Sequence, residues 1–301
     1  MNWFEKILAG LNGKMEMPLA YGWFHLMCWF LVIVLTVTLV MLAIRYRKDD
    51  AKIAKITRIV VLTYSILGIV LEIYKQLNFS FTPTEDGGVW DYRWYAFPFQ
   101  FCSTPMYIGL IAGCLKKGKF QEYLYSYLAT FALFAGLCVM IYPGDVFTRT
   151  VGINIQTMVC HGGMVVMGIY LLFSGMVKLE WKTIFKALSV FAVLVCIADV
   201  FNIIYHFAGG TETCNLFFIS PYFPCTLPIL SMIYEVVPYP VFLIIYIIGF
   251  TLAAFVMLAV AIGIDRLIKH KKKIKVWHGL EDDAVMDKIF EPILDKNEKI
   301  M

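Results

Sequence analysis

A cysteine flanked by two prolines is the residue of this sequence that is best placed to do chemistry. Cys102 lies in the run Phe97-Pro98-Phe99-Gln100-Phe101-Cys102-Ser103-Thr104-Pro105. Pro105 has no N–H, so the carbonyl of Phe101 loses its helical donor, and protein or water must satisfy the backbone beside the thiol. A thiol becomes a nucleophile when a neighbouring base takes its proton. The sequence therefore predicts covalent catalysis with Cys102 as nucleophile and His161 as base.

The composition indicates what kind of structure must position these residues. Of 301 residues, 60% are hydrophobic and 16% are charged, whereas a soluble domain has about 45–50% apolar and about 25% charged residues. These values argue against a soluble enzyme, a secreted disulfide scaffold, a disordered chain and a nucleic-acid module. The apolar residues form runs of the roughly 20 residues that cross a bilayer. We therefore expect an all-α polytopic membrane protein with seven transmembrane helices, at residues 24–44, 58–77, 95–115, 122–142, 152–174, 183–206 and 239–265.

The distribution of lysine and arginine predicts the orientation of these spans. Seventeen lie in one set of connections, at residues 45–56, 116–121, 175–187 and 266–275, whereas the alternate set carries four. Because cytoplasmic loops carry the excess of positive charge, we expect the N-terminus outside and the C-terminus in the cytoplasm of a cell-membrane protein. The formal net charge of +4 follows from this topology and implies no nucleic-acid partner.

The chain is expected to have three parts. Residues 1–23 form an extracytoplasmic segment, in which apolar residues at helical spacing between Trp3 and Leu11 predict a short helix lying on the membrane surface. Residues 24–265 form the seven-helix transmembrane domain. Residues 266–301 form a cytoplasmic tail that begins basic and becomes acidic.

Polar residues inside the predicted spans lie at a common depth. At about 1.5 Å of rise per residue, Cys102 and His161 lie roughly 10–14 Å below the outer boundary. Four predicted spans thus carry polar residues at a similar depth, in the outer half of the bilayer. This common depth predicts a single cavity that opens to the extracytoplasmic side. The residues that we expect to bind substrate or to support catalysis there are Glu72, Lys75, Gln100 and Asn202.

Several of these residues also have purely structural interpretations. Glu72 and Lys75 are three residues apart, so they share a helix face and can pair with each other. His161 or Asn202, each considered alone, is typical of a hydrogen-bonded interhelical contact, and the adjacent Gly162-Gly163 permits close helix packing. Their shared depth is the property that favours a functional site.

Eight cysteines allow a further interpretation. Six lie in predicted spans, while Cys214 and Cys225 lie in the outer loop 207–238, on the oxidising side. A disulfide between these two is left open, because spacing alone does not establish its geometry. No Cys–His cluster has the spacing of a zinc site, and we expect neither a metal nor a cofactor.

The residues around Cys102 resemble those of a known family. The run Pro98-Phe99-Gln100-Phe101-Cys102 is similar to the signature of bacterial YwaF-like integral membrane proteins, whose eukaryotic relatives are the transmembrane protein 164 family. Further matches follow in order along nearly the whole chain: Glu72, Cys160-His161-Gly162, Asn202, Asn215-Leu216-Phe217-Phe218 and Val237-Pro238-Tyr239-Pro240. The sequence departs from the pattern in having Phe for Leu around the thiol and a single His161 where many relatives have a pair.

This resemblance implies a membrane-embedded acyltransferase that moves a fatty acyl group between phospholipids. It implies Cys102 as the acyl carrier and His161 as its base, with phospholipids and lysophospholipids as partners. Glycerol esters lie just below the headgroups, which agrees with the depth estimated for both residues. The acyl chain, the headgroup, transfer versus hydrolysis and the oligomeric state are left open.

Other functions also fit parts of the sequence. A transporter or lipid-handling protein with a polar cavity open to the outside is one, although no internal repeat supports it. A seven-helix receptor fits the orientation, but a retinal pigment needs a lysine in the last span, and 239–265 contains none. Hydrolases of the androgen-induced-gene type use a Thr/His pair. Thr104 points about 200° away from Cys102 around a helix, so the thiol is the preferred nucleophile.

Overall fold

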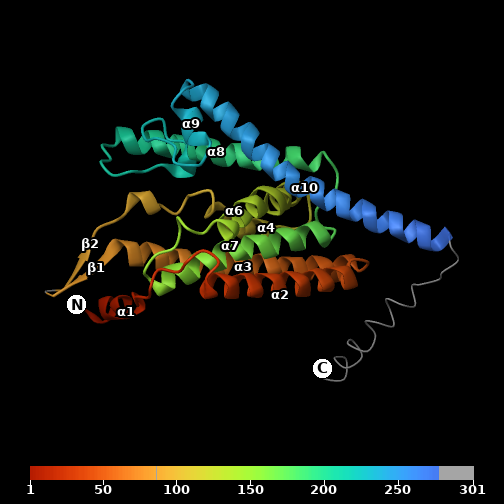
Figure 1. The fold of residues 1–301 in the computed structure, drawn as a ribbon, viewed down its shortest axis with the longest axis horizontal. Helices are drawn as coiled ribbons and strands as arrows, with labels where there is room; N and C mark the ends of the chain where they lie inside the picture. Colours follow the sequence, from red (N-terminus) through yellow and green to blue (C-terminus); the bar gives the residue numbers. More distant parts are fainter. Residues whose placement is uncertain (86, 278–301) are drawn as a thin grey trace. The chain divides into compact units, whose positions relative to one another are not determined.

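The computed structural model describes residues 1–85 and 87–277 (Figure 1). The chain divides into two compact units, Met1–Leu258 and Ala259–Met301. The helices are α1 (Trp3–Leu11), α2 (Trp23–Tyr46), α3 (Asp50–Ser80), α4 (Thr104–Cys114), α5 (Lys119–Tyr127), α6 (Leu133–Ile141), α7 (Val151–Phe173), α8 (Thr183–Phe207), α9 (Leu230–Tyr234) and α10 (Tyr239–Trp277). The all-α class is confirmed, with one small addition: an antiparallel hairpin of β1 (Phe81–Thr84) and β2 (Gly87–Trp90).

Within the described ranges, six helical stretches are long and apolar enough to cross a membrane. They are Trp23–Tyr46, Asp50–Ser80, Lys119–Ile141, Val151–Phe173, Thr183–Phe207 and Tyr239–Lys269. Each contains most or all of one predicted span. The exposed large side chains of α2, which include Phe30 and Ile33, fit a helix that faces lipid rather than water. The protein is therefore a helical membrane protein with several apolar helices.

The predicted span 95–115 is not a continuous helix, and this is the main correction to the sequence-based fold. Only Thr104–Cys114 is α-helical, and 11 residues cover about 16 Å, or half of the hydrocarbon thickness. A short 3₁₀ turn, η1 (Trp94–Ala96), precedes it, and residues 97–103 are irregular. Pro98 and Pro105 explain the difference, because a proline fits the first turn of a helix and not its interior.

Helix α4 packs against α3 through glycines. A Cβ atom added at Gly109 would lie 2.4 Å from Ser65 Oγ, and one added at Gly113 would lie 2.6 Å from the side chain of Leu62. Both distances are well inside van der Waals contact, so the two backbones come closer here than any larger residue permits. Because residue numbers rise along α4 as they fall along α3, the two helices are antiparallel.

The irregular segment before α4 continues along the same partner. Gln76 Nε2, near the end of α3, donates to the carbonyl of Ala96 at 2.6 Å. Beyond α4, Lys117 Nζ lies 3.4 Å from Asp50 Oδ2, at the start of α3. The chain from Ala96 to Lys117 therefore follows α3 along most of its length, with an irregular half and a helical half.

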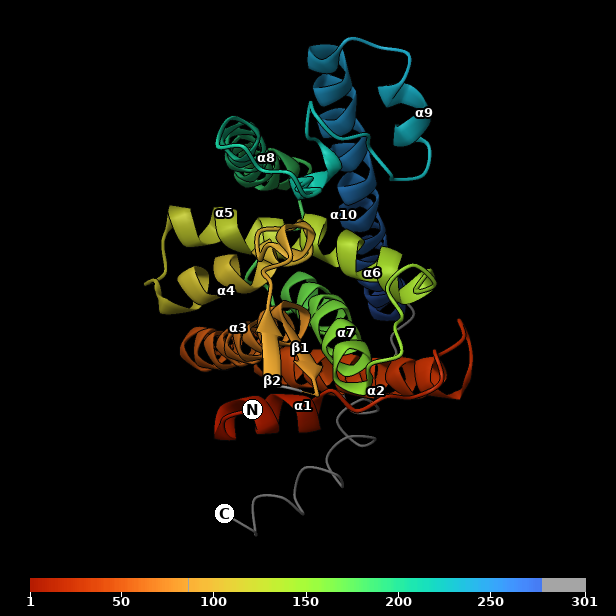
Figure 2. The ribbon, with the colours of Figure 1, turned by 90° about the vertical axis from the view of Figure 1, so that its left-hand side faces the viewer.

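Helix α7, which carries His161, lies at the centre of the first unit. It packs against α2, α3, α6 and the π-helical turn η2 (Leu128–Ala132), and Figure 2 shows it between these elements. Most of its residues are buried. A Cβ atom at Gly136 of α6 would lie 2.7 Å from the carbonyl oxygen of His161. Glycine is thus what lets α6 approach the histidine-bearing helix.

The predicted surface helix is present as α1. Leu8 is buried, and the ring of Phe4 stacks on Trp90 of the hairpin with centroids 6.4 Å apart. Trp3 and Leu11 are exposed. Figure 1 shows α1 beside the hairpin at one end of α3. Its location at a membrane surface stays a prediction.

The second unit holds the last turns of α10. The helix was predicted to end at residue 265, but it continues to Trp277. The reason is local: Lys, Arg, Ile and Leu are good helix formers, and no glycine or proline interrupts them before Gly279. Asp265 and Lys269, four residues apart, form an ion pair of 2.6 Å. The rest of the predicted cytoplasmic tail, residues 278–301, lies outside the described residues.

Candidate active site

Cys102 lies directly before Ser103, the N-cap residue of α4. A turn holds it there, in which the N–H of Ser103 donates to the carbonyl of Gln100 at 2.9 Å. The carbonyl of Phe101, left without a donor by Pro105, accepts instead from Thr104 Oγ1 at 3.0 Å. The side chain of Thr104 thus supplies the hydrogen-bond donor that Pro105 lacks, as the sequence predicted that protein or water must.

Thr104 is itself held by a second hydroxyl. Its Oγ1 lies 2.9 Å from the phenolic oxygen of Tyr127. Because the Thr104 proton points to Phe101, the Tyr127 hydroxyl is the donor of this pair. Both side chains are fully buried. The hydroxyl of Thr104 is therefore committed to the backbone, which favours the thiol over Thr104 as nucleophile.

The phenylalanines beside the thiol belong to an aromatic cluster. Phe101 contacts three rings, with centroids at 5.4 Å for Phe191, 5.5 Å for Phe217 and 5.2 Å for Phe250. Phe99 also contacts Phe217, at 6.0 Å. These partners come from α8, α10 and the loop between them. One flank of the Cys102 segment is thus apolar and tightly packed.

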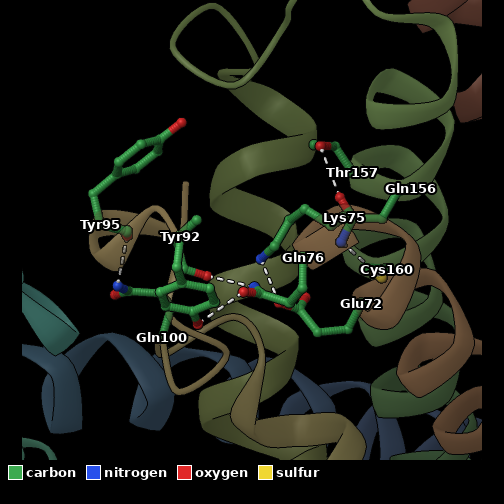
Figure 3. A network of polar contacts seen from close by, with 10 residues as sticks. Glu72, Lys75, Gln76, Tyr92, Tyr95, Gln100, Gln156, Thr157 and Cys160 are labelled. Atoms are coloured by element: carbon green, nitrogen blue, oxygen red, sulfur yellow. Dashed lines mark hydrogen bonds and ion pairs between the residues drawn. The ribbon is translucent and has the colours of Figure 1, made fainter. Parts of the chain in front are cut away.

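The other flank is a polar network around Glu72, which is buried on α3 (Figure 3). Lys75 Nζ lies 2.7 Å from Glu72 Oε1, with side-chain exposures of 13% and 5%, so the predicted pairing is confirmed. Gln76 Nε2 donates to the same carboxylate oxygen at 2.8 Å, and the Tyr92 hydroxyl donates to Gln76 Oε1 at 2.9 Å. The carboxylate is therefore bound by two donors from its own helix.

This network reaches the candidate catalytic residues by its charges. Glu72 and Lys75 both act electrostatically on the Cys102 thiol, and Lys75 also acts on the ring of His161. Among these four predicted site residues, the described part of the chain shows one direct contact, the ion pair of Glu72 and Lys75.

His161 is held in a defined tautomer. Its Nδ1 lies 2.7 Å from the carbonyl oxygen of Thr157, one turn earlier on α7. A carbonyl only accepts, so Nδ1 carries the proton, and Nε2 of the neutral ring keeps its lone pair. That is the state of a general base. In the described part of the chain no hydrogen bond joins the His161 ring to the Cys102 thiol.

The glycines after His161 let two helices approach it. A Cβ atom would lie 2.6 Å from Val32 of α2 at Gly162, and 2.7 Å from the ring of Tyr64 of α3 at Gly163. The packing role predicted for this glycine pair is confirmed. Tyr64 in turn lies close enough to the thiols of Cys102 and Cys160 to interact with them electrostatically.

Gln100 and Asn202, the other two predicted residues, have different surroundings. Gln100 Nε2 donates to the carbonyl of Tyr95 at 3.3 Å, while its Oε1 is buried without a partner. Figure 3 shows its amide turned toward Tyr95 and away from Glu72. Asn202 of α8 uses both ends of its amide on Leu216, accepting from the N–H at 2.8 Å and donating to the carbonyl at 3.1 Å. Neither shares a hydrogen bond with the Glu72 network.

Further polar residues beside Glu72 and Lys75 were given no role in the site from the sequence. Gln76 follows Glu72 by four residues, a spacing that signals contact on a helix. Gln156 Nε2 donates to the sulfur of Cys160 at 3.6 Å, and Figure 3 shows both beside Lys75. Tyr92 comes from beyond the hairpin, and its sequence position gave no signal.

The two cysteines of the outer loop are both free and buried, so the disulfide left open by the sequence is not formed. Burial raises the pKa of the Cys214 thiol to about 11. A thiol with that pKa is largely protonated and unreactive at neutral pH.

Comparison with known proteins agrees with the resemblance inferred from the Cys102 segment. No curated protein and no solved structure matches the chain. The model of one family matches residues 20–261, which is most of the chain and includes both Cys102 and His161. The chain therefore belongs to the TMEM164 family.

Proposed function

We propose that this membrane protein moves a fatty acyl group between phospholipids through a thioester on Cys102, with His161 as base. The observation that carries the proposal is the position of Cys102, at a break directly before α4 in a segment that is hydrogen-bonded to the polar side chains of α3. The tautomer of His161 supports it, because Nε2 is free to accept a proton. The approach of thiol and ring to hydrogen-bond distance is assigned to the substrate-bound state, in which catalytic contacts shorten.

The reaction has two balanced halves. In the first, the Cys102 proton passes to His161 Nε2, the thiolate attacks an ester carbonyl of the donor phospholipid, and the C–O bond breaks. The departing lysophospholipid alkoxide takes the proton back from His161. In the second, the hydroxyl of an acceptor lysophospholipid gives its proton to His161 and attacks the thioester. The C–S bond then breaks, and the thiolate is reprotonated.

Two features favour negative charge at this position. The start of α4, where Cys102 lies, is the positive end of the helix dipole. Lys75 has a half-buried ammonium group with more N–H donors than its pairing with Glu72 uses. Both can stabilise a thiolate and the oxyanion of the tetrahedral intermediate.

We further propose seven crossings, with the N-terminus outside, the C-terminus in the cytoplasm, and a location in the cell membrane. The path of residues 96–117 along α3 supports a crossing that is half irregular and half helical. With it, the seventeen basic residues fall on one side and the four on the other. The test places a label at each end of the chain and treats intact cells with a membrane-impermeant reagent. If the reagent reaches both labels from the same side, this topology is contradicted.

The decisive experiment tests for an acyl-enzyme. The purified protein is incubated with a phospholipid labelled in its acyl chain, and a hydroxylamine-sensitive adduct is sought by mass spectrometry. We expect the adduct on Cys102 in the wild type and in Cys114→Ser, which removes a thiol from the other end of α4, and no adduct in Cys102→Ser. Addition of lysophospholipid should discharge it.

Two outcomes would speak against the enzyme. A wild type that forms no adduct and never re-esterifies lysophospholipid refutes the proposal. Lipid flux in liposomes that persists in Cys102→Ala would instead favour the alternative function, a lipid-handling protein.

A further inference from the structure

The loop between α8 and α9 contains two consecutive phenylalanines with left-handed backbones. Phe217 has a φ of 57° and Phe218 a φ of 59°. For a residue with a bulky side chain this conformation is a true outlier. Such residues persist only where the surroundings fix them, and they cluster at ligand-binding sites. The surroundings must therefore hold this strained turn.

Hydrogen bonds from three side chains hold the turn in place. Asn202 binds both backbone groups of Leu216. The hydroxyl of Tyr246, on α10, donates to the carbonyl of Phe217 at 2.9 Å. Asn215 Oδ1 accepts from the N–H of Ser220 at 2.8 Å. Helices on both sides thus keep the turn in a conformation that it would not adopt alone.

The result is a ring inserted beside the Cys102 segment. Phe217 is fully buried and contacts Phe99 and Phe101. Three rings pack on Phe101 in the described chain, and two of them stand on long helices, Phe191 on α8 and Phe250 on α10. Phe217 stands on a loop.

We propose that Phe217 is the wall that limits the length of the acyl chain accepted by Cys102. The inference rests on the proposed function, because it concerns the same thiol. A thioester on Cys102 needs apolar surface for its chain, and the α3 side of the segment is occupied by Glu72 and Lys75. The apolar side is the aromatic cluster, and Phe217 is the ring on Phe101 that stands on a loop and not on a long helix.

The test offers the protein an equimolar mixture of phospholipids with myristoyl, palmitoyl, stearoyl and longer saturated chains. The lengths of the chains bound to Cys102 are read by mass spectrometry. Because a pocket discriminates roughly tenfold or more for each methylene it excludes, Phe217→Ala should raise the ratio of stearoyl to myristoyl adduct roughly tenfold. Phe217→Leu and Tyr246→Phe, which keep more of the packing, should shift the ratio in the same direction by less.

Phe242→Ala is the matched control. Phe242 is also a fully buried ring of the same size, but it contacts Tyr234 and Tyr246 instead of Phe101. Its removal should leave the ratio unchanged. Elution as a monodisperse peak in detergent shows that a variant is folded. If Phe217→Ala is not folded by this measure, Phe217→Leu is used for the test.

The outcomes separate the two proposals. If every variant forms the adduct with the wild-type distribution of chain lengths, or if Phe242→Ala shifts it as much as Phe217→Ala, the role of Phe217 is refuted and the acyltransferase stands. If the wild type forms no adduct, the proposed function falls, and this inference falls with it.

Discussion

The hydroxyl of Thr104 offers the sharpest test of how the break at Cys102 is stabilised. Thr104→Val keeps the shape of the side chain and removes its oxygen. Two buried groups then lose their partner, the carbonyl of Phe101 and the hydroxyl of Tyr127. Each unsatisfied buried group costs about 1–3 kcal/mol, so we expect the two together to lower the free energy of unfolding by about 2–6 kcal/mol.

Two further variants divide this loss between the bonds. Thr104→Ser keeps the hydroxyl and should cost less than about 1 kcal/mol. Tyr127→Phe removes only the outer donor and should cost about 1 kcal/mol, because Thr104 still donates to Phe101. In a double-mutant cycle the Thr104 and Tyr127 changes should be non-additive, since they remove the same bond.

The assay is equilibrium unfolding of the purified protein in detergent, with alkylation of Cys102 followed in parallel. Loss of the Thr104 bond should loosen the turn and speed alkylation of the native protein. If Thr104→Val unfolds with wild-type stability and leaves alkylation unchanged, the threonine is not what satisfies the Phe101 carbonyl, and the account of the break given above is wrong.

Three more predictions follow from the same neighbourhood. Gly136→Ala places a Cβ 2.7 Å from the His161 carbonyl, so it should displace α7 and abolish the Cys102 adduct without removing any reactive group; normal adduct formation would contradict this. Glu72→Gln removes the charged partner of Lys75, whose side chain is 13% exposed, which should cost about 1–3 kcal/mol in unfolding experiments, and adding Lys75→Met should restore most of it. The Cys214 thiol, whose pKa is raised to about 11, should alkylate slowly at pH 8 and faster as the pH rises toward 11; rapid labelling at pH 8 in the folded protein would show that it is not buried.

Much of the fold could be predicted because the signals were local. Apolar runs predicted the long helices, and Pro98 and Pro105 indicated where the third predicted span is interrupted. Its shortening to 11 helical residues, however, depends on how the segment packs on α3. The spacing of Glu72 and Lys75 was enough to predict their ion pair, because residues three apart on a helix are neighbours wherever the helix lies.

The parts of the site that depend on distant segments could not be predicted. Asn202 binds a backbone fourteen residues away across a loop, and no periodicity connects the two. The position of His25 near the start of a predicted span gives no sign of its partners, but the side chain is fully buried. Its Nδ1 accepts from the N–H of Tyr21, and its Nε2 donates to the carbonyl of Met140. Only the tertiary packing of α2 on α6 creates that place.

The π-helical turn at Leu128–Ala132 decides which residue of α6 meets the histidine helix. Such a turn holds one residue more than an α-helical turn, and it therefore rotates everything after it by about 100°. Deleting a single residue there would restore an uninterrupted α-helix and leave Gly136 at its place against His161, whereas an α-helical turn of the full sequence would bring Ala135 there instead. The wide turn thus absorbs one extra amino acid, and the residues after it keep the helix face that they present to α7.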